Sequence, residues 1–332
     1  MSHWRSVAYA ESPLQLLNVV EAHAYGILGP NCELVVRDPN GSIAPTLSAL
    51  KEIGLPIGIK VFGSKDTPQT AKHTTPKGDY VHVLGDPFSG QQQSGLLRRN
   101  RVTDVVIVDD GLNTFAAVEA LAANRAMVRP GQVVSPARRT LGLAMTHQLR
   151  RAAFSGRLTV FTAMPPTEAL HQELAVLDAH VVFHQYPWLS STPAAMPAGN
   201  DTVVVGSGFV ADGHIHQDPY VEWVRELARN GPVLYYPHRR TTTPLRRHIA
   251  ALDGVSVAYA SASVEVSLRG LNPPASVHML PTTALITLTP MLSTRGVPVV
   301  GHQVPSHWWT DQTSPGVRDF LTRPLSLFES QP

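Results

Sequence analysis

Short runs of apolar and β-branched residues recur along the whole chain of 332 residues. Most of these runs are continuous instead of alternating with polar residues. Continuous runs indicate strands that are buried on both faces, as in parallel sheets. We predict strands at 6–10, 33–37, 57–62, 80–84, 105–108, 158–162, 181–183, 202–205, 233–236, 255–259, 276–280 and 298–300.

Helical patterns lie between many of these strands, at 13–25, 112–124, 167–177 and 220–230. Strands that alternate with helices predict βαβ units and an α/β fold. The number of predicted strands is larger than one doubly wound domain of ordinary size contains. The uncharged segment 187–200 (PWLSSTPAAMPAGN) is rich in Pro, Ala and Ser, and we interpret it as a linker. The prediction is two Rossmann-like domains, 1–190 and 200–310, with a tail at 311–332 that packs back on the first domain.

Composition narrows the function classes. Hydrophobic residues make up 43% of the chain, and Lys+Arg 27 against Asp+Glu 25 gives a net charge of +2, which argues against general nucleic-acid binding. The single cysteine, Cys32, excludes an internal disulfide framework. We find no signal peptide at the start and no apolar run that would span a membrane, so we expect a soluble cytoplasmic protein. The patterns GxGxxG, GxxxxGK[ST] and HExxH are absent, so we expect no nicotinamide cofactor and no metal.

The first candidate segment is Glu11–Gln15 (ESPLQ), directly after the first strand. Ser12 and Gln15 form a capping box around Pro13, and helix initiation alone explains them. The functional interpretation is that this helix N-terminus lines the cleft between the two domains.

The second segment is VVIVDDG, in which Asp109, Asp110 and Gly111 follow a strand and precede a helix. Two adjacent carboxylates repel each other, which raises the pKa of one and suits it to work as a general base. The alternative interpretation is structural: an N-cap and a turn glycine at the start of the helix. Because ligands bind at the carboxyl ends of strands, we weigh the general-base and the structural interpretation equally.

The third segment, Pro237-His238-Arg239-Arg240, follows the strand at 233–236. Arg can bind a phosphate as a fork, and His can donate a proton to it, so we favour phosphate binding over a solvated basic turn.

The fourth segment is PTTAL, where Thr282 and Thr283 stand between a strand and a helix. Their hydroxyls and the helix N-terminus could hold a phosphate, although capping alone explains them too. Upstream, Glu265 begins a short helix, where it could bind ribose hydroxyls or simply interact with the helix dipole.

Three further features remain outside these segments. Gly85–Leu96 (GDPFSGQQQSGL) has the polar composition of an acceptor loop or of a plain surface loop. Trp308 and Trp309 could stack on a sugar, but we favour packing in a core or an interface. His302 and His307 lack the carboxylate neighbours of a metal site. Peripheral association with a membrane through lipid-linked acceptors stays open, although we identify no amphipathic basic helix to support it.

Taken in order, SPLQLLNVVEA, VVIVDDG, YYPHRR and PTTAL resemble the motifs of the bacterial GT-B sialyltransferases and polysialyltransferases, which carry a D/E-D-G, an HP and a Ser/Thr-pair motif. The stretch VVVGSGFVADGHIHQDPYVEWV is similar to that family's entry into its second domain. The resemblance implies two Rossmann-like domains with the active site in the cleft between them.

The resemblance also implies an activity. It is an inverting, metal-independent transfer of sialic acid from a CMP-activated donor to a hydroxyl of a glycan or small-molecule acceptor. By this resemblance Asp110, or else Asp109, is the base. His238 binds the donor phosphate with Pro237, Arg239 and Arg240; Thr282 and Thr283 bind it too, and Glu265 contacts the ribose.

The chain departs from the family in reading PHRR and in carrying a Thr-Thr pair. The donor could therefore be another acidic sugar linked to CMP, such as Kdo. Two alternatives stay open: a nucleotide-sugar epimerase or hydrolase of the same fold, and a catalytically silent nucleotide-binding protein.

Overall fold

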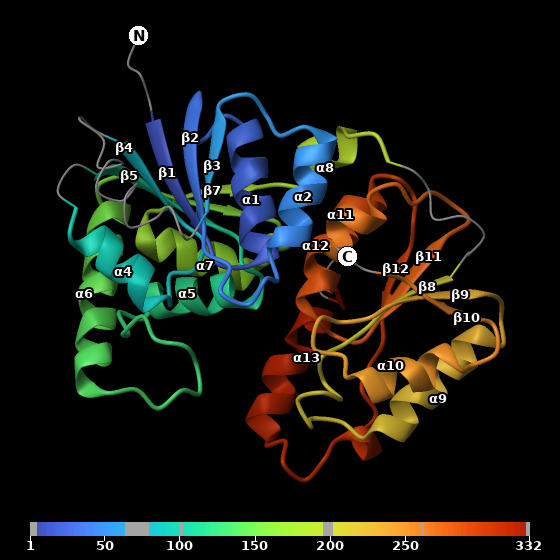
Figure 1. Ribbon diagram of the computed structural model, residues 1–332. Coiled ribbons are helices and arrows are strands. Elements are labelled where there is room, and N and C mark those ends of the chain that lie inside the picture. The colour runs from blue at the N-terminus through green and yellow to red at the C-terminus, as the bar shows by residue number, and fades with distance from the viewer. Residues whose placement is uncertain (1–4, 64–79, 100–101, 195–201, 260–261, 330–332) are drawn as a thin grey trace. The chain divides into compact units, whose positions relative to one another are not determined.

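The computed structural model describes residues 5–63, 80–99, 102–194, 202–259 and 262–329 (Figure 1). The chain divides into two compact units, Met1–Trp188 and Leu189–Pro332. The segment that we interpreted as a linker begins with the short helix α8 (Pro187–Ser191), and its residues 195–200 lie outside the described part.

Unit 1 is built on a seven-stranded parallel sheet in the order β3-β2-β1-β4-β5-β6-β7. The chain starts in the middle of the sheet, builds outward to β3 and then returns to add β4 beside β1. The strands are β1 (Arg5–Ala10), β2 (Asn31–Val36), β3 (Ile59–Phe62), β4 (Tyr80–Leu84), β5 (Val102–Val108), β6 (Leu158–Thr162) and β7 (His180–Phe183).

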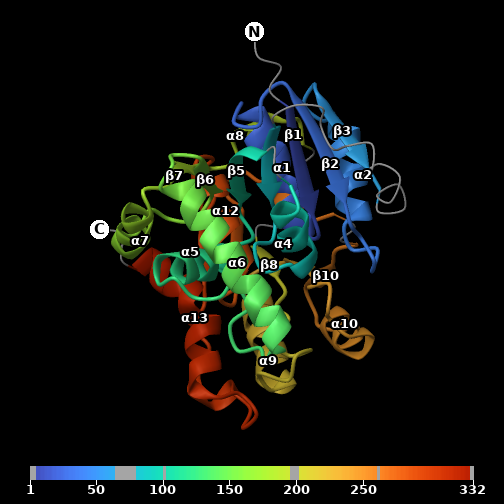
Figure 2. The same cartoon turned by 90° about the vertical axis from the view of Figure 1, so that its left-hand side faces the viewer.

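Helices cover both faces of this sheet, as Figures 1 and 2 show for α1 and α2 on one side and α4, α5 and α6 on the other. The two coverings explain why the strands read as continuous apolar runs: all five residues of β4 are buried. The helices are α1 (Pro13–Ala24), α2 (Ala44–Ile53), α4 (Gly90–Leu97), α5 (Leu112–Ala122), α6 (Pro136–Ala153) and α7 (Glu168–Leu177).

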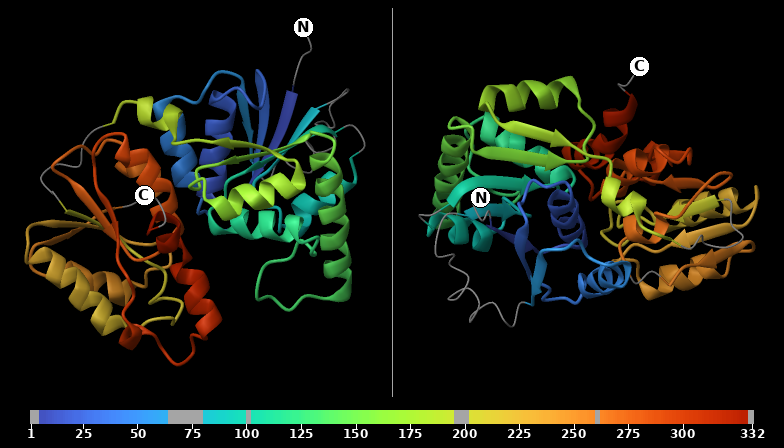
Figure 3. Two further views of the ribbon diagram at one scale, coloured as in Figure 1. Left: turned by 180° about the vertical axis from the view of Figure 1, so that it is seen from behind. Right: turned by 90° about the horizontal axis from the view of Figure 1, so that it is seen from above.

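Unit 2 repeats this plan with a five-stranded parallel sheet in the order β10-β9-β8-β11-β12 (Figure 3). Its strands are β8 (Thr202–Val205), β9 (Val233–Tyr236), β10 (Val255–Val257), β11 (Ser276–Met279) and β12 (Val299–Gly301). Its helices are α9 (Gln217–Ala228), α10 (Thr243–Ala250), α11 (Val264–Leu268), α12 (Thr283–Ser293) and α13 (Pro315–Glu329), with a 3₁₀ turn η1 (Ser306–Trp308).

Each sheet reverses its strand order beside the strand that starts it, between β1 and β4 in unit 1 and between β8 and β11 in unit 2. In open α/β sheets the carboxyl ends of strands at such a reversal are where ligands bind. The predicted α/β fold is confirmed, and its strand order points to the same edge of each sheet as the motifs do.

Six helices of the described residues were not predicted from the sequence: α2, α4, α6, α8, α10 and α13. The longest, α6, contains Gly142 in its middle, which lowers helix propensity. A Cβ there would stand 2.9 Å from the carbonyl oxygen of Met127, so the glycine lets the helix pack against that main chain. Within the described residues, no helix has the length and apolar character needed to cross a membrane.

The segment after β12 closes the core of unit 2. Trp308 and Trp309 are 7% and 8% exposed and pack with Phe209 and Ile215, so the packing predicted for them is confirmed. Ile215 and Trp309 also form an antiparallel bridge. The helix α13 that follows contacts α12 of the same unit, and packing of the tail on unit 1 stays a prediction.

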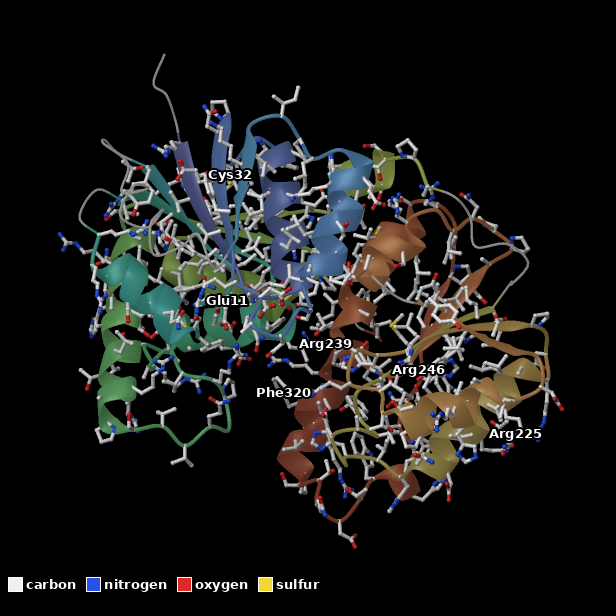
Figure 4. All side chains as sticks on the ribbon, viewed as in Figure 1. Glu11, Cys32, Arg225, Arg239, Arg246 and Phe320 are labelled. Carbon is white, nitrogen blue, oxygen red and sulfur yellow. The ribbon has the colours of Figure 1, made fainter. Side chains whose placement is uncertain are left out.

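Replacing Trp309 with alanine should lower the free energy of unfolding of unit 2 by about 3–5 kcal/mol, the usual cost of removing a buried large aromatic. The exposed Phe320 on α13, labelled in Figure 4, is the matched control. Phe320→Ala should change stability by less than about 1 kcal/mol. Urea unfolding of both variants measures the difference, and equal midpoints would contradict a core role for Trp309.

Candidate active site

Three chain segments meet at the carboxyl edge of the unit 1 sheet. The Ser12 segment follows β1, the Gly85-Asp86 turn follows β4, and Asp109-Asp110-Gly111 follows β5. Figure 4 shows the direction of the strands, because Cys32 at the start of β2 and Glu11 after β1 are labelled toward opposite ends of the sheet. The predicted candidates Ser12, Gln15 and Asp110 are therefore brought together.

Asp109 is fully buried and serves the fold. Its Oδ2 atom accepts hydrogen bonds of 2.9 Å from both the Thr162 hydroxyl, at the end of the neighbouring strand β6, and the Ala163 main-chain N–H that follows it. Its Oδ1 atom accepts one of 2.8 Å from the Gly111 N–H. Burial raises the pKa of Asp109, and these donated hydrogen bonds oppose the shift. These three hydrogen bonds enclose the Asp109 side chain within the fold.

Asp110, unlike Asp109, is partly exposed. Oδ1 accepts a 3.2 Å hydrogen bond from the Ser12 hydroxyl, and Oδ2 accepts one of 2.8 Å from the Asn113 amide. Desolvation, followed by the negative charge of Asp86, raises the pKa of Asp110 to about 7, against the lowering effect of hydrogen bonds from Asn113, Gln15 and Ser12. A carboxylate with a pKa near neutrality is suited to general-base work.

The capping box at the start of α1 does more than begin a helix. The Ser12 hydroxyl accepts a 3.2 Å hydrogen bond from the Gln15 N–H as an N-cap, and the same hydroxyl donates a hydrogen bond to Asp110 Oδ1. Gln15 is buried, and its Oε1 accepts a 2.8 Å hydrogen bond from the Glu11 N–H. Both predicted roles, helix capping and lining the candidate site, are therefore compatible in the same residues.

Gly111 makes the sharp turn from β5 into α5. Its φ of 63° and ψ of −129° belong to a region that only glycine adopts readily. The main-chain N–H of Asp110 donates a 2.7 Å hydrogen bond to the hydroxyl of Thr114 in the first turn of α5. The glycine thus allows the chain to turn while Asp110 stays at the edge of the sheet.

Sequence reasoning missed Asp86, Asn113 and Arg129. Asp86 is 2% exposed and forms an ion pair with Arg129, which also donates a 3.4 Å hydrogen bond to Asn113 Oδ1. Asn113 in turn binds Asp110, so one arginine organises both carboxylates. Burial raises the pKa of Asp86, and Arg129 opposes this rise. A signal was available, since Asp86 follows a buried strand as Asp110 does.

The predicted acceptor loop, Gly85–Leu96, is mostly helix α4. Two of its glutamines hold the local fold: Gln92 Oε1 accepts from the N–H groups of Gly85 and Asp86, at 3.0 and 3.2 Å. Gln93 donates to the carbonyl oxygens of Pro87 and Met127, at 2.7 and 2.8 Å. The polar composition of this segment is therefore largely used inside the protein.

In unit 2 the turn Gly206-Ser207-Gly208 after β8 packs against the Pro237–Arg240 turn after β9. A Cβ at Gly206 would stand 2.9 Å from the His238 main-chain nitrogen, and one at Gly208 would stand 3.0 Å from the His238 ring. Both glycines are needed for this close approach, so the His238 ring lies directly on the β8 turn.

The protonation of His238 follows from its contacts. Its Nδ1 accepts a 3.2 Å hydrogen bond from the Arg240 main-chain N–H, so the ring proton of the neutral form is on Nε2. Desolvation, followed by the charges of Arg240 and Arg239, lowers the pKa of His238 to about 4. The resting side chain is therefore a neutral imidazole that can donate a hydrogen bond through Nε2.

The two arginines of this turn are exposed and differ in their contacts. Arg240 forms a 2.8 Å ion pair with Asp212, whereas the Arg239 side chain forms no ion pair or hydrogen bond within the part of the chain that the structure describes. Figure 4 labels Arg239 at the turn after β9. Arg239 is thus the more available cation of the pair.

Thr282 and Thr283 stand at the N-terminus of α12, after β11. Thr282 is the N-cap residue, yet its hydroxyl makes no capping hydrogen bond and only a 3.9 Å contact to the Met279 sulfur. The hydroxyls and the first N–H groups of α12 are therefore available to an anion. The simple capping role that competed with ligand binding does not account for Thr282.

Glu265 is 5% exposed in the first turn of α11 and accepts a 2.7 Å hydrogen bond from the hydroxyl of Thr287 on α12. This bond ties its carboxylate to the same helix that Thr282 and Thr283 begin. His238 and the Thr282-Thr283 pair follow β9 and β11, the two neighbours of β8 in the sheet, whereas Glu265 lies on α11, between β10 and β11 in the chain. Among the described residues, no group of three or more His, Cys, Asp or Glu is arranged to hold a metal ion.

The architecture is similar to those of solved bacterial sialyltransferases. One is the 2,6-sialyltransferase of Vibrionaceae Photobacterium sp. JT-ISH-224, solved with the donor product CMP and the acceptor substrate lactose. It matches with a TM-score of 0.56 and 12% identity over 98% of this chain and 76% of its own. The 2,3-sialyltransferase of Photobacterium phosphoreum matches with a TM-score of 0.55 and 9% identity over 99% of this chain and 97% of its own.

A UDP-N-acetylglucosamine 2-epimerase from Rickettsia bellii has the same architecture, with a TM-score of 0.51 and 10% identity over 97% of this chain and 88% of its own. No protein-family model matches the chain, and no curated protein matches it in sequence. At such low identities the likeness concerns the fold. Together with the two parallel sheets, it confirms the predicted GT-B architecture of two Rossmann-like units.

Proposed function

We propose that this protein is an inverting glycosyltransferase that moves a sialic acid or a related acidic sugar from a CMP-activated donor to an acceptor hydroxyl. The observation that carries the proposal is the half-buried Asp110 carboxylate, with its pKa near neutrality, at the edge of a Rossmann-like sheet. The resemblance of the four sequence motifs to bacterial sialyltransferases supports the choice of donor, as does the likeness in fold.

In this proposal Asp110 accepts the proton of the acceptor hydroxyl as its oxygen forms a bond to the anomeric carbon of the donor sugar. Ser12 and Asn113 hold the two carboxylate oxygens, which fixes the direction of the remaining lone pairs. The negative charge of Asp86 helps to raise the pKa of Asp110, which keeps the Asp110 carboxylate basic. Arg129 donates a hydrogen bond to Asn113 and so orients the amide that holds Asp110. Asp109 has no chemical role, because its oxygens are enclosed by main-chain and hydroxyl donors.

The bond that breaks joins the anomeric carbon to a phosphate oxygen, and CMP leaves with the electron pair and an added negative charge. His238 Nε2–H, the guanidinium of Arg239 and the N-terminus of α12 with Thr282 and Thr283 are the groups that we assign to that charge. Glu265 is assigned to the ribose. One phosphate carries less charge than two, so these donors can stabilise it without the divalent cation that many diphosphate donors need.

The two alternatives are separated by one set of incubations. Transfer requires both a CMP-sugar and an acceptor, and release of CMP should rise when lactose or a glycan extract is added. Hydrolysis or epimerisation would proceed without any acceptor, and the solved epimerases of this fold make UDP-N-acetylglucosamine the substrate to test for it. Binding of CMP without any turnover would identify a silent nucleotide-binding protein.

Replacing Asp110 with asparagine should lower the transfer rate by roughly 10²–10⁴-fold, because the general base is lost while shape is kept. Binding of CMP should stay unchanged. Steady-state kinetics with the CMP-sugar and calorimetry with CMP measure the two quantities.

Asp109→Asn is the matched control, since it changes the adjacent carboxylate in the same way. We expect it to lower the free energy of unfolding by about 1–3 kcal/mol, because an amide cannot accept all the hydrogen bonds that Asp109 accepts. The folded Asp109 variant should keep most of its activity. Full activity in Asp110→Asn would exclude Asp110 as the base.

The pH dependence of transfer should report the Asp110 carboxylate. The base must be ionised, so kcat/KM should fall about tenfold per unit below pH 7 and level off above it. The same raised pKa makes ionised Asp110 unfavourable for folding. Stability attributable to this group is present below its ordinary pKa of 3.8 and is lost as pH rises through about 7.

Thermal unfolding at several pH values shows, independently of activity, whether ionisation of Asp110 lowers the stability of the fold. Asp110→Asn should melt at a higher temperature than the parent at pH 8, and the difference should vanish toward pH 4. A rate that is flat between pH 5 and 8, with chemistry limiting, would contradict the assignment.

Calorimetry in the presence of EDTA should detect CMP binding to the parent protein, with UDP and GDP at least tenfold weaker. Thr282→Ala combined with Thr283→Ala should weaken CMP binding by tenfold or more, because two hydroxyl hydrogen bonds to a charged phosphate are lost. Thr282→Ser combined with Thr283→Ser keeps both hydroxyls and should bind like the parent. Equal affinity in the alanine and serine variants would refute the phosphate site, and a preference for UDP would refute the donor class.

A further inference from the structure

A stretch of unit 1 that surrounds the helix α6 carries an unusual charge distribution. Between residues 125 and 167 the sequence contains no Asp, Glu or Lys, although the whole chain is nearly neutral. All its formal charges are arginines: Arg125, Arg129, Arg138, Arg139, Arg150, Arg151 and Arg157. This stretch contains α6, the helix that sequence analysis did not predict, and α6 is an amphipathic basic helix.

Several of these arginines are used inside the protein. Arg129 binds Asp86, Arg138 donates to the carbonyl oxygen of Phe88, and Arg150 donates to the carbonyl oxygen of Ala122 at 3.2 Å. By contrast, the exposed guanidinium groups of Arg139 and Arg151 make no ion pair or hydrogen bond within the described ranges. These free cations are therefore not explained by the fold.

The free arginines share one face of α6 with exposed apolar side chains. Arg139, Leu143, His147 and Arg151 follow one another four residues apart, so they lie in a row along the helix. Phe154 comes eleven residues after Leu143, about three turns at 3.6 residues per turn, and so continues that row. Leu143 is 39% exposed and Phe154 is 55% exposed. Figure 2 shows this helix in front of the sheet of unit 1.

Few acidic residues lie on the described elements that pack against α6. The elements packed against α6 are α4, α5, β5 and β6. Of these, α4 and β6 contain no acidic residue, and α5 and β5 contain one each, Glu119 and Asp104. Arg125, also exposed, adds a further cation beside α6, where its carbonyl oxygen accepts a 2.6 Å hydrogen bond from Thr146.

We propose that the α6 surface, formed by Arg125, Arg139, Leu143, His147, Arg151 and Phe154, docks on an anionic phospholipid membrane. The guanidinium groups bind lipid phosphates, and Leu143 and Phe154 enter the boundary between headgroups and acyl chains. A bilayer of anionic lipid offers negative charge and apolar depth along one plane, which matches a helix face that carries both cationic and apolar side chains. A soluble polyanion offers no apolar depth. The inference does not depend on the donor or on the reaction.

Sedimentation of the full-length protein with vesicles tests the proposal. Partition into vesicles of phosphatidylcholine containing phosphatidylglycerol should exceed partition into pure phosphatidylcholine by tenfold or more, and it should fall as salt is raised. Arg139→Gln combined with Arg151→Gln should reduce the partition coefficient by roughly 30-fold, given the usual contribution of an arginine near a charged membrane.

The matched control is Arg246→Gln combined with Arg247→Gln on α10, which removes the same charge from exposed positions outside the α6 surface. It should bind vesicles like the parent. Equal loss in the two double variants would overturn the proposal, because it would mean that net charge alone governs binding.

A second pair of variants separates a membrane from a soluble polyanion. Leu143→Ser combined with Phe154→Ser should weaken vesicle binding by fivefold or more without changing binding to poly-uridylate. Both residues are exposed, so the variant should fold, which circular dichroism checks. Unchanged vesicle binding in this variant, or parent binding to poly-uridylate as tight as to anionic vesicles, would overturn membrane docking in favour of a polyanion surface.

Discussion

Every candidate functional group of this protein depends on the parallel pairing of its strands. In each sheet all strands run the same way, so the residues that follow them arrive at one edge. The helices that return the chain begin at that edge too, with their unsatisfied N–H groups. Where the strand order reverses, neighbouring helices leave on opposite faces and the edge opens. The same constraint therefore delivers Ser12, Asp86 and Asp110 in one unit, and His238 and Thr282 in the other.

The two adjacent aspartates, Asp109 and Asp110, differ in burial and therefore in the contacts that they make. Asp109 is enclosed and links β5 to β6, so it fixes the turn on which the next residue stands. Asp110 is partly exposed and is held by the side chains of Ser12, the N-cap residue of α1, and Asn113 on α5. Its raised pKa results from desolvation and from the neighbouring Asp86. An ionised, poorly solvated carboxylate lowers the stability of the fold. Groups of this kind concentrate at functional sites, where a raised pKa serves the chemistry.

In unit 2 the candidate groups are hydrogen-bond donors and cations, in contrast to the carboxylates of unit 1. Its edge gathers donors: the His238 imidazole, the guanidinium of Arg239 and the free N-terminus of α12. Gly206 and Gly208 let the β8 turn lie against His238, which desolvates the ring and keeps it neutral. A neutral imidazole beside two arginines is a directional donor that adds no further charge to be buried. The α6 surface uses arginine differently, as an exposed charge with no partner among the residues that the structure describes.

The sequence alone determined the fold class and the strands, because continuous apolar runs require burial on both faces. It also identified the motif residues after β1, β5, β9 and β11, because a polar segment directly behind a buried strand must emerge at the carboxyl edge. It did not determine which aspartate is partly exposed, since Asp109 and Asp110 are identical in type and differ only in what packs around them. Asp86 and Arg129 were missed because their proximity to Asp110 comes from strand pairing between segments far apart in the chain. The helix α6 was missed for a related reason: Gly142 weakens its local propensity, and only its tertiary contact with the main chain of Met127 compensates for that weakness.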